Sequence, residues 1–271
     1  MQNNLYSDVP PTKLRNIKEE FIEAHKEPFW VWLCDRYLFG MLENEFYAMR
    51  VKNAKKYEER DKNYSSIIYA PHANWWDGQV GYNLCRRVFD VDLIMMIEEL
   101  GRFPILSKAG AFSINKKSAQ EAMKSLKYSV EQLKDPKRGL WIFPQGIVRP
   151  PNFRPIEFQS GMTYIAQNCI KKYGGVNLIP TAINYSFLRE YSPEILVEVG
   201  EPIVLKDEKA DRHELTKFLE DSFTALCDRQ FAQISSGDLS DYEIVFETPV
   251  SWWKKIERKL KQIKAKRTQD D

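Results

Sequence analysis

Short apolar runs alternate with longer amphipathic stretches from residue 65 onward, and this alternation limits the folds open to the chain. The runs expected to form strands are 65–70, 91–97, 110–115, 139–143, 176–184 and 194–199. The stretches expected to form helices are 76–88, 116–134, 158–173 and 208–234. Strands and helices that alternate at this spacing are typical of α/β proteins, in which helices pack on a sheet. We therefore expect an α/β fold with a mixed, largely covered β-sheet flanked by helices.

The segments outside this region differ in composition. We expect an N-terminal helical or interfacial segment over residues 1–60, an α/β domain over 61–245 and a basic amphipathic tail over 246–271. Residues 1–27 are polar and charged, with two prolines near the start. This composition predicts a loose arm followed by a short helix.

Residues 28–50 are expected to form an N-terminal helix with a broad apolar face. Pro28 is a plausible first residue, because proline is favoured at the start of a helix. The positions that fit one helical stripe are Trp30, Leu33, Tyr37, Leu38, Met41 and Met49. Two interpretations remain open: the helix packs on the sheet, or it lies in a membrane surface and gates an acyl chain.

The C-terminal tail carries most of the unbalanced charge. Residues 251–267 hold eight cations and one anion, a net charge of +7, which leaves −5 for the rest of a chain whose total is +2. Apolar side chains recur on one helical face, at Trp252, Trp253, Ile256, Leu260 and Ile263. A basic amphipathic helix of this kind suits an anionic membrane surface. A helix docked on the domain is the alternative. Nucleic acid is disfavoured, because no basic stripe with interleaved aromatic residues continues into the domain.

The cysteines and the N-terminal residues indicate the cellular compartment. The four cysteines are far apart and lack metal-site or disulfide-framework spacing, so we expect reduced, mostly buried thiols and no bound metal: Cys34, Cys85, Cys169 and Cys227. The polar N-terminus lacks the apolar core of a secretory signal. The sequence contains no stretch of about 18 uncharged apolar residues, so we expect no transmembrane helix. We expect a cytoplasmic protein that reaches the cytoplasmic face of a membrane from its surface.

His72 and Asp77 form an H-x4-D pair directly after the apolar run 65–69. A histidine can accept a proton near neutral pH, and a nearby carboxylate can fix its tautomer and stabilise its charged form. The pair lies where a strand is followed by a helix, which is a frequent position for active sites in α/β proteins. His25 and His213 lie in charged helical contexts and are expected at the surface.

A second motif lies in residues 139–149. An apolar strand there runs into the turn Phe143-Pro144-Gln145-Gly146, and a cation, Arg149, follows. The proline limits the backbone of such a turn, and the glycine allows close approach to a ligand.

The two motifs together resemble the signature blocks of the glycerolipid acyltransferase family, the lysophosphatidate acyltransferase-like enzymes. Two weaker blocks appear in the family's order: residues 110–116 resemble the middle block, and residues 179–183 resemble the late V-P-V-A-I block. The resemblance covers roughly residues 65–205, and the order of four blocks is more specific than any one of them.

The resemblance implies transfer of a fatty acyl group from a thioester to a lipid hydroxyl, with His72 as general base and Asp77 as its orienting group. It also implies that Phe143, Pro144, Gln145 and Gly146 line the acceptor site. The donor would be acyl-CoA or acyl carrier protein, used as a co-substrate without any further cofactor. Acyl carrier protein is therefore a further candidate partner.

Arg149 and Lys116 are candidates to bind an acceptor phosphate, and ordinary surface cations are the alternative. Trp75 and Trp76 either wall the acyl or thioester channel or pack in the core. Three departures from the family pattern concern the acceptor side: Gln145 replaces a glutamate, the cation lies one residue later, and Lys116 replaces an arginine. We expect a lysophospholipid or related glycerolipid as the acceptor, and these departures keep a glycolipid or carotenoid hydroxyl open as the alternative.

Three other functions fit the sequence less well. A serine hydrolase is disfavoured, because the chain lacks G-x-S-x-G. A metal enzyme would need more ligands than His72 and Asp77. A non-catalytic, membrane-associated lipid-binding protein with the same fold is favoured by Gln145 and disfavoured by the intact His/Asp pair.

Overall fold

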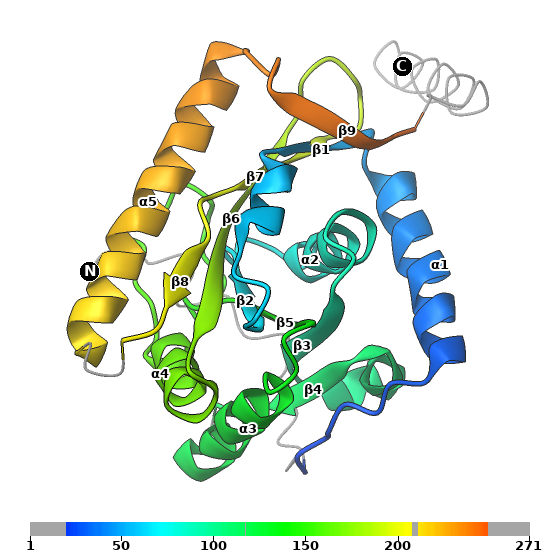
Figure 1. Cartoon of the computed structure of the whole chain (residues 1–271). Helices are drawn as coiled ribbons and strands as arrows, with labels where there is room; N and C mark the ends of the chain where they lie inside the picture. The colour runs from blue at the N-terminus through cyan, green and yellow to red at the C-terminus, as the bar shows by residue number, and fades with distance from the viewer. Residues whose placement is uncertain (1–19, 117, 208–210, 249–271) are drawn as a thin grey trace, which may run out of the picture.

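The computed structural model describes residues 20–116, 118–207 and 211–248, which form a nine-stranded sheet with helices on both faces (Figure 1). Five strands are parallel to their neighbours, in the spatial order β4 (Ala111–Ile114), β3 (Asp92–Glu98), β5 (Arg138–Ile142), β2 (Ser66–Tyr69) and β6 (Val176–Ser186). The sheet continues with β7 (Glu194–Val199), antiparallel to β6, then β1 (Ala48–Lys52), parallel to β7, and β9 (Tyr242–Glu247), antiparallel to β1. The short β8 (Ile203–Leu205) pairs antiparallel with the start of β6.

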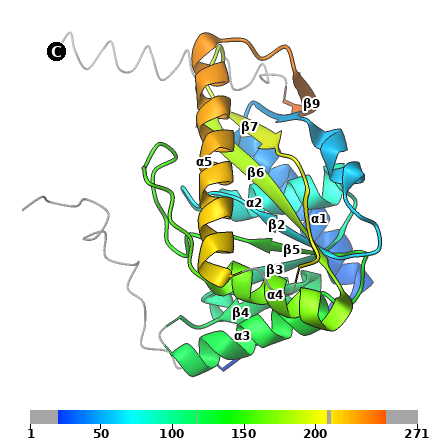
Figure 2. The ribbon, with the colours of Figure 1, turned by 60° about the vertical axis from the view of Figure 1, so that its left-hand side comes forward.

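Helices cover the two faces of the sheet in separate layers (Figure 2). One layer contains α1 (Pro28–Glu45) and α2 (Asp77–Asn83), which continues into a π-helical turn, η2 (Leu84–Val88). The other contains α3 (Ala119–Gln132), α4 (Gly161–Tyr173) and α5 (Arg212–Ser236). Each layer buries its own hydrophobic cluster against the sheet. The described residues also contain three 3₁₀ turns: η1 (Ala54–Glu59), η3 (Leu100–Arg102) and η4 (Pro104–Ala109).

Local sequence signals set the ends of the main elements. Asp211 caps α5 by accepting hydrogen bonds from the first backbone N–H groups of the helix, and Ser118 caps α3 in the same way. α5 ends at Gly237, whose φ of +77° suits a residue without a Cβ atom. β2 is buried at all four positions, as expected for a central parallel strand covered on both faces.

The α/β fold expected from the sequence is confirmed, with all six predicted strands and all four predicted helices in place. β1, β8 and β9 were not predicted. β8 is apolar but only three residues long, and β9 mixes apolar residues with glutamates and is largely exposed, so neither stands out as a strand in the sequence. β1 lies between β7 and β9, so the sheet begins within the segment assigned to an N-terminal helix.

The N-terminal helix is shorter than expected, and one position of its predicted apolar stripe, Met49, falls outside it. Leu33 and Tyr37 are exposed, and Met49 lies in β1. The buried positions follow steps of four residues: Cys34, Leu38 and Leu42. A helix with apolar residues around most of its circumference offers several possible buried sides. The packing of α1 against α2 determines which side is buried.

Residues 20–27 are extended, so the short helix expected there is wrong for this part of the arm. The segment runs beside β4, where the backbone of Ile22 exchanges hydrogen bonds with Ser113. It thereby covers the edge of the sheet, which would otherwise present unpaired backbone groups. The basic tail over 251–267 lies outside the described residues. Among the residues that are described, no helix has the length and hydropathy needed to cross a bilayer.

The close approach of α2 to β5 predicts a sharp difference between two glycines of that helix. A Cβ atom on Gly81 would lie 2.2 Å from the Trp141 ring, whereas nothing lies within 4 Å of one on Gly78. Gly81→Ala should therefore lower the free energy of unfolding by about 1–3 kcal/mol through overpacking. Gly78→Ala, the matched control, should leave it unchanged or raise it by up to about 1 kcal/mol. Urea unfolding measures both, and equal stabilities would contradict the tight packing at Gly81.

Candidate active site

The loop between β2 and α2 holds a buried ion-pairing arrangement. Asp77 is the first residue of α2 and is fully buried. Its Oδ2 accepts hydrogen bonds from the backbone N–H groups of Ala73 (2.6 Å) and Asn74 (2.8 Å) and lies 3.1 Å from His72 Nδ1. A buried carboxylate needs such donors, because burial removes its hydration. Asp77 thus folds the loop around itself and fixes the position of His72.

This geometry prepares the His72 ring to act as a base. With Nδ1–H donating to Asp77, the tautomer assigned from the hydrogen bonds leaves Nε2 with a free lone pair. The side chain of His72 is 26% exposed, so a hydroxyl group can reach it, whereas Asp77 is shielded from water. The pair can accept a proton at Nε2 and stabilise the resulting imidazolium through Asp77.

Three contacts join the second motif to His72. The Phe143 ring stacks on the His72 ring, with centroids 4.2 Å apart and an interplanar angle of 9°. The Gln145 side-chain oxygen accepts from the His72 backbone N–H at 3.1 Å, and the Arg149 backbone N–H donates to the His72 carbonyl at 2.7 Å. The loops meet because β2 and β5 are adjacent parallel strands, so their carboxyl ends lie at one edge of the sheet.

The turn after β5 has the tight geometry expected from its sequence. Gly146 has a φ of +69° and donates its N–H to the Phe143 carbonyl. Pro144 is buried, and its carbonyl accepts from the Gln159 N–H at 2.8 Å. Lys116, at the end of β4, donates to the Gly146 carbonyl at 2.5 Å, so the middle block of the sequence also reaches this turn.

The two candidate phosphate-binding cations differ in their surroundings. Lys116 Nζ lies 2.6 Å from a carboxylate oxygen of Glu98, which offsets part of its charge. The Arg149 guanidinium lies 4.9 Å from the centre of the Phe153 ring and pairs with no carboxylate of the described residues. Arg149 is therefore the cation of the two with more capacity for a new anion.

The two tryptophans of the first motif have different environments. Trp76 is half-buried and packs edge-on against Phe46, at 5.3 Å between centroids, in the cluster beneath α1. Trp75 is exposed and contacts Trp76. The packing interpretation describes Trp76, and Trp75 is the one available to a ligand. His25 and His213 are exposed, as expected.

Tyr185, near the end of β6, contacts the pair but was missed in the sequence. Its hydroxyl donates to Asp77 Oδ1 at 2.7 Å. Burial, together with the charge of Asp77, raises the pKa of Tyr185 well above its ordinary value, so the phenol remains a donor. The only sequence signal is its place two residues after the late block 179–183, which carries no indication that the strand extends to Asp77.

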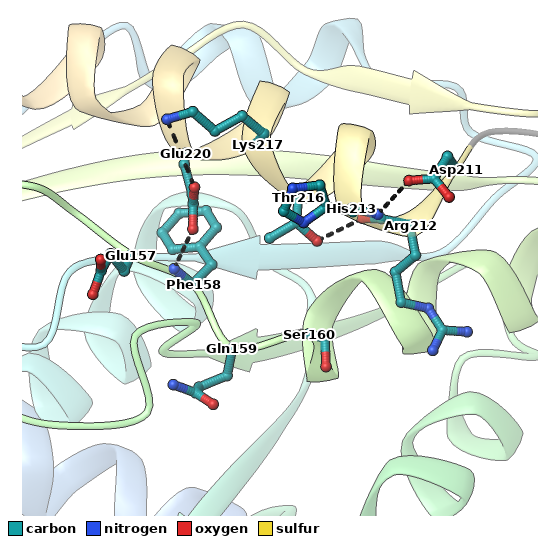
Figure 3. A pocket seen from close by; sticks show the side chains of 10 residues that line it. All are labelled: Glu157, Phe158, Gln159, Ser160, Asp211, Arg212, His213, Thr216, Lys217 and Glu220. Carbon is teal, nitrogen blue, oxygen red and sulfur yellow. Dashed lines mark hydrogen bonds and ion pairs between the residues drawn. The ribbon is translucent and has the colours of Figure 1, made fainter.

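A pocket of about 620 Å³ opens between the 157–160 loop and the first turns of α5 (Figure 3). Neither His72 nor Asp77 lines it. Glu220 reaches across to accept the Phe158 N–H at 2.6 Å, and this contact ties the loop to α5. The backbone N–H of Gln159, which lines the pocket, donates to the Pro144 carbonyl. The pocket wall therefore stabilises the turn beside His72.

Metal and thiol chemistry find little support among the residues that the structure describes. No group of three or more His, Cys, Asp or Glu side chains there is placed to hold a metal ion. The four cysteines are free and buried, as expected. Burial raises the pKa of Cys169 and of Cys227 to about 12, so neither thiol ionises readily.

Comparisons with known proteins bear on the fold and the family. The fold is similar to that of the 1-acyl-sn-glycerophosphate (LPA) acyltransferase PlsC from Thermotoga maritima, with a TM-score of 0.53 and 16% sequence identity over 74% of this chain and 80% of that one. No curated protein matches the chain. The family model described as "Acyltransferase" matches residues 49–184, which include the His/Asp pair, the turn after β5 and most of β6. The chain therefore belongs to the acyltransferase family.

Proposed function

We propose that this acyltransferase moves a fatty acyl group from a thioester donor, acyl-CoA or acyl carrier protein, to the hydroxyl group of a lysophospholipid or related glycerolipid. The observation that carries the proposal is the meeting of His72, Asp77 and the turn after β5 at one edge of the sheet. A base, its orienting carboxylate and a tight turn that can approach an acceptor are thereby within one site.

The reaction needs no covalent acyl-enzyme. His72 Nε2 takes the proton of the acceptor hydroxyl as its oxygen attacks the thioester carbonyl. The tetrahedral intermediate then collapses, the carbon–sulfur bond breaks, and the imidazolium returns its proton to the leaving thiolate. The products are an ester and a free thiol. A positioned general base typically contributes about 10²–10⁴-fold to such a rate.

Removing the base tests this mechanism directly. His72→Ala should lower thiol release from palmitoyl-CoA in the presence of lysophosphatidate by about 10²-fold or more, because the hydroxyl loses its proton acceptor. His25→Ala and His213→Ala are matched controls, since both histidines are exposed and lie outside the site. A thiol-release assay measures all three, and full turnover by His72→Ala would overturn the catalytic assignment.

Arg149 supports a phosphorylated acceptor. Its backbone N–H is hydrogen-bonded to the His72 carbonyl, so the residue lies beside the His72 loop, and a guanidinium binds phosphate in a bidentate way. Lys116, already engaged by Glu98 and Gly146, would supply a weaker second charge. A neutral acceptor, such as a glycolipid or carotenoid hydroxyl, is the second candidate, and the uncharged Gln145 with the offset charge of Lys116 favours it.

Two acceptors separate these candidates. Arg149→Ala should raise KM for lysophosphatidate about tenfold or more and leave KM for monoacylglycerol within about twofold, because only the former has a phosphate to lose. Arg154→Ala is the control: it lies on the same loop but is ion-paired with Asp228 of α5. An unchanged KM for lysophosphatidate would exclude Arg149 as its phosphate ligand and favour the neutral acceptor.

The exposed side of α1 supports contact with a lipid surface. Phe29, Trp32, Leu33 and Tyr37 lie along one side of the helix, and Trp32 and Tyr37 are 57% and 67% exposed. The opposite side is held by an ion pair between Asp35 and Arg86. An exposed aromatic face on a well-anchored helix suits an interfacial position, to which the basic tail over 251–267 would add attraction for anionic lipids.

Replacing this face should weaken membrane binding. In Trp32→Ser/Leu33→Ser, the partition onto phosphatidylcholine–phosphatidylglycerol vesicles should fall about tenfold, because less apolar area is buried in the bilayer. Co-sedimentation at high salt, which screens the tail, isolates this contribution. Phe218→Ser/Phe231→Ser on α5 removes equally exposed rings elsewhere and should change nothing. Equal effects of the two double variants would contradict a specific role for α1.

A further inference from the structure

Asp77 is held from two sides by different parts of the chain. Its Oδ2 receives the two backbone N–H groups of its own loop and faces His72. Its Oδ1 receives the hydroxyl of Tyr185, which belongs to β6 and is 108 positions away in the sequence. Among the hydrogen bonds of the described residues, Tyr185 is the donor to Oδ1. The stabilisation of this oxygen therefore depends on the Tyr185 hydroxyl.

We propose that Tyr185 is a positioning residue of the acyltransfer reaction, which sets the orientation and the effective charge of Asp77 and thereby the basicity of His72. The proposal rests on the function proposed above. Tyr185 does not contact the reacting atoms. Its hydroxyl acts through Asp77, by fixing the plane of the carboxylate and by withdrawing part of its negative charge.

The ring of Tyr185 has a separate role in packing. It lies 5.7 Å from the Phe46 ring, which also packs against Trp76 of the His72 loop. Two groups of that loop face the phenol oxygen: the Asp77 carboxylate, which accepts its hydrogen bond, and the Asn74 side chain. Of the groups facing the phenol, Asp77 is the charged one. The hydroxyl and the ring can therefore be tested separately.

Loss of the hydroxyl moves the pH dependence in one direction by two routes. Without the donor, the buried carboxylate is less well stabilised as an anion and takes up a proton at higher pH. While it remains ionised, its undiminished charge stabilises the His72 imidazolium more strongly, so the free base also appears only at higher pH. Both routes shift the acidic limb of the rate profile upward.

Tyr185→Phe tests the hydroxyl, because it keeps the ring. With palmitoyl-CoA and lysophosphatidate, kcat should fall about tenfold, KM should change less than about twofold, and the acidic limb of kcat/KM should rise by about one pH unit. Phe46→Leu is the matched packing control, since it disturbs the same cluster without touching the hydrogen bond. It should lower thermal stability and leave the acidic limb in place.

A second measurement does not depend on turnover. The chain has three histidines, so protein labelled with ¹⁵N only at histidine gives few side-chain resonances. The resonances that disappear in His72→Gln belong to His72. In Tyr185→Phe, the pH midpoint of the His72 resonances should rise by about one unit, while those of His25 and His213 stay unchanged.

The outcomes separate this proposal from the function on which it rests. An unchanged acidic limb and an unchanged His72 midpoint in Tyr185→Phe, with His72→Ala inactive, would overturn the positioning role and leave the acyltransferase mechanism standing. An equal shift in Phe46→Leu would also overturn it, since packing alone would then explain the effect. Full activity of His72→Ala would instead refute the proposed function.

Discussion

The site depends on the parallel pairing of β2 with β5 on one side and with β6 on the other. Tyr69, the last residue of β2, is in register with Ile142 and with Pro180, so the chain leaves β2 and β5 at one level of the sheet. The His72 loop and the turn after β5 therefore emerge side by side. β6 continues for six residues beyond that level, paired with β7, and this extra length brings Tyr185 to Asp77. The staggered strand ends determine which loops can meet.

Burial of Asp77 is the electrostatic consequence of this arrangement. An ionised carboxylate without water is strongly destabilised unless donors surround it. Here the donors come from its own loop and from β6, so the charge also fixes the loop conformation. The fold and the chemistry therefore share one group. The orientation of the His72 ring is thus set by backbone and strand positions, which surface fluctuations disturb little.

Local patterns were sufficient to predict the α/β class, six of the strands and the helices between them, because apolar strands and amphipathic helices leave direct traces in the sequence. They failed where structure depends on partners distant in the chain. β1 is a strand because β7 and β9 flank it, and the buried side of α1 is chosen by its contact with α2. Tyr185 was missed for the same reason: a tyrosine at the end of a strand is ordinary until the length of β6 relative to β2 is known. The order of the motifs implied that Phe143 and His72 belong to one site, but not that their rings stack.

The burial of all four cysteines also affects how the protein can be studied. Thiol-specific reagents react with the exposed, ionised form of a cysteine, and the native chain offers them almost none. A reagent that counts free thiols therefore has little background from the folded protein. Applied without substrate, the same reagent reports opening of the fold. The reactivity of the four buried cysteines therefore measures how much of the protein is folded.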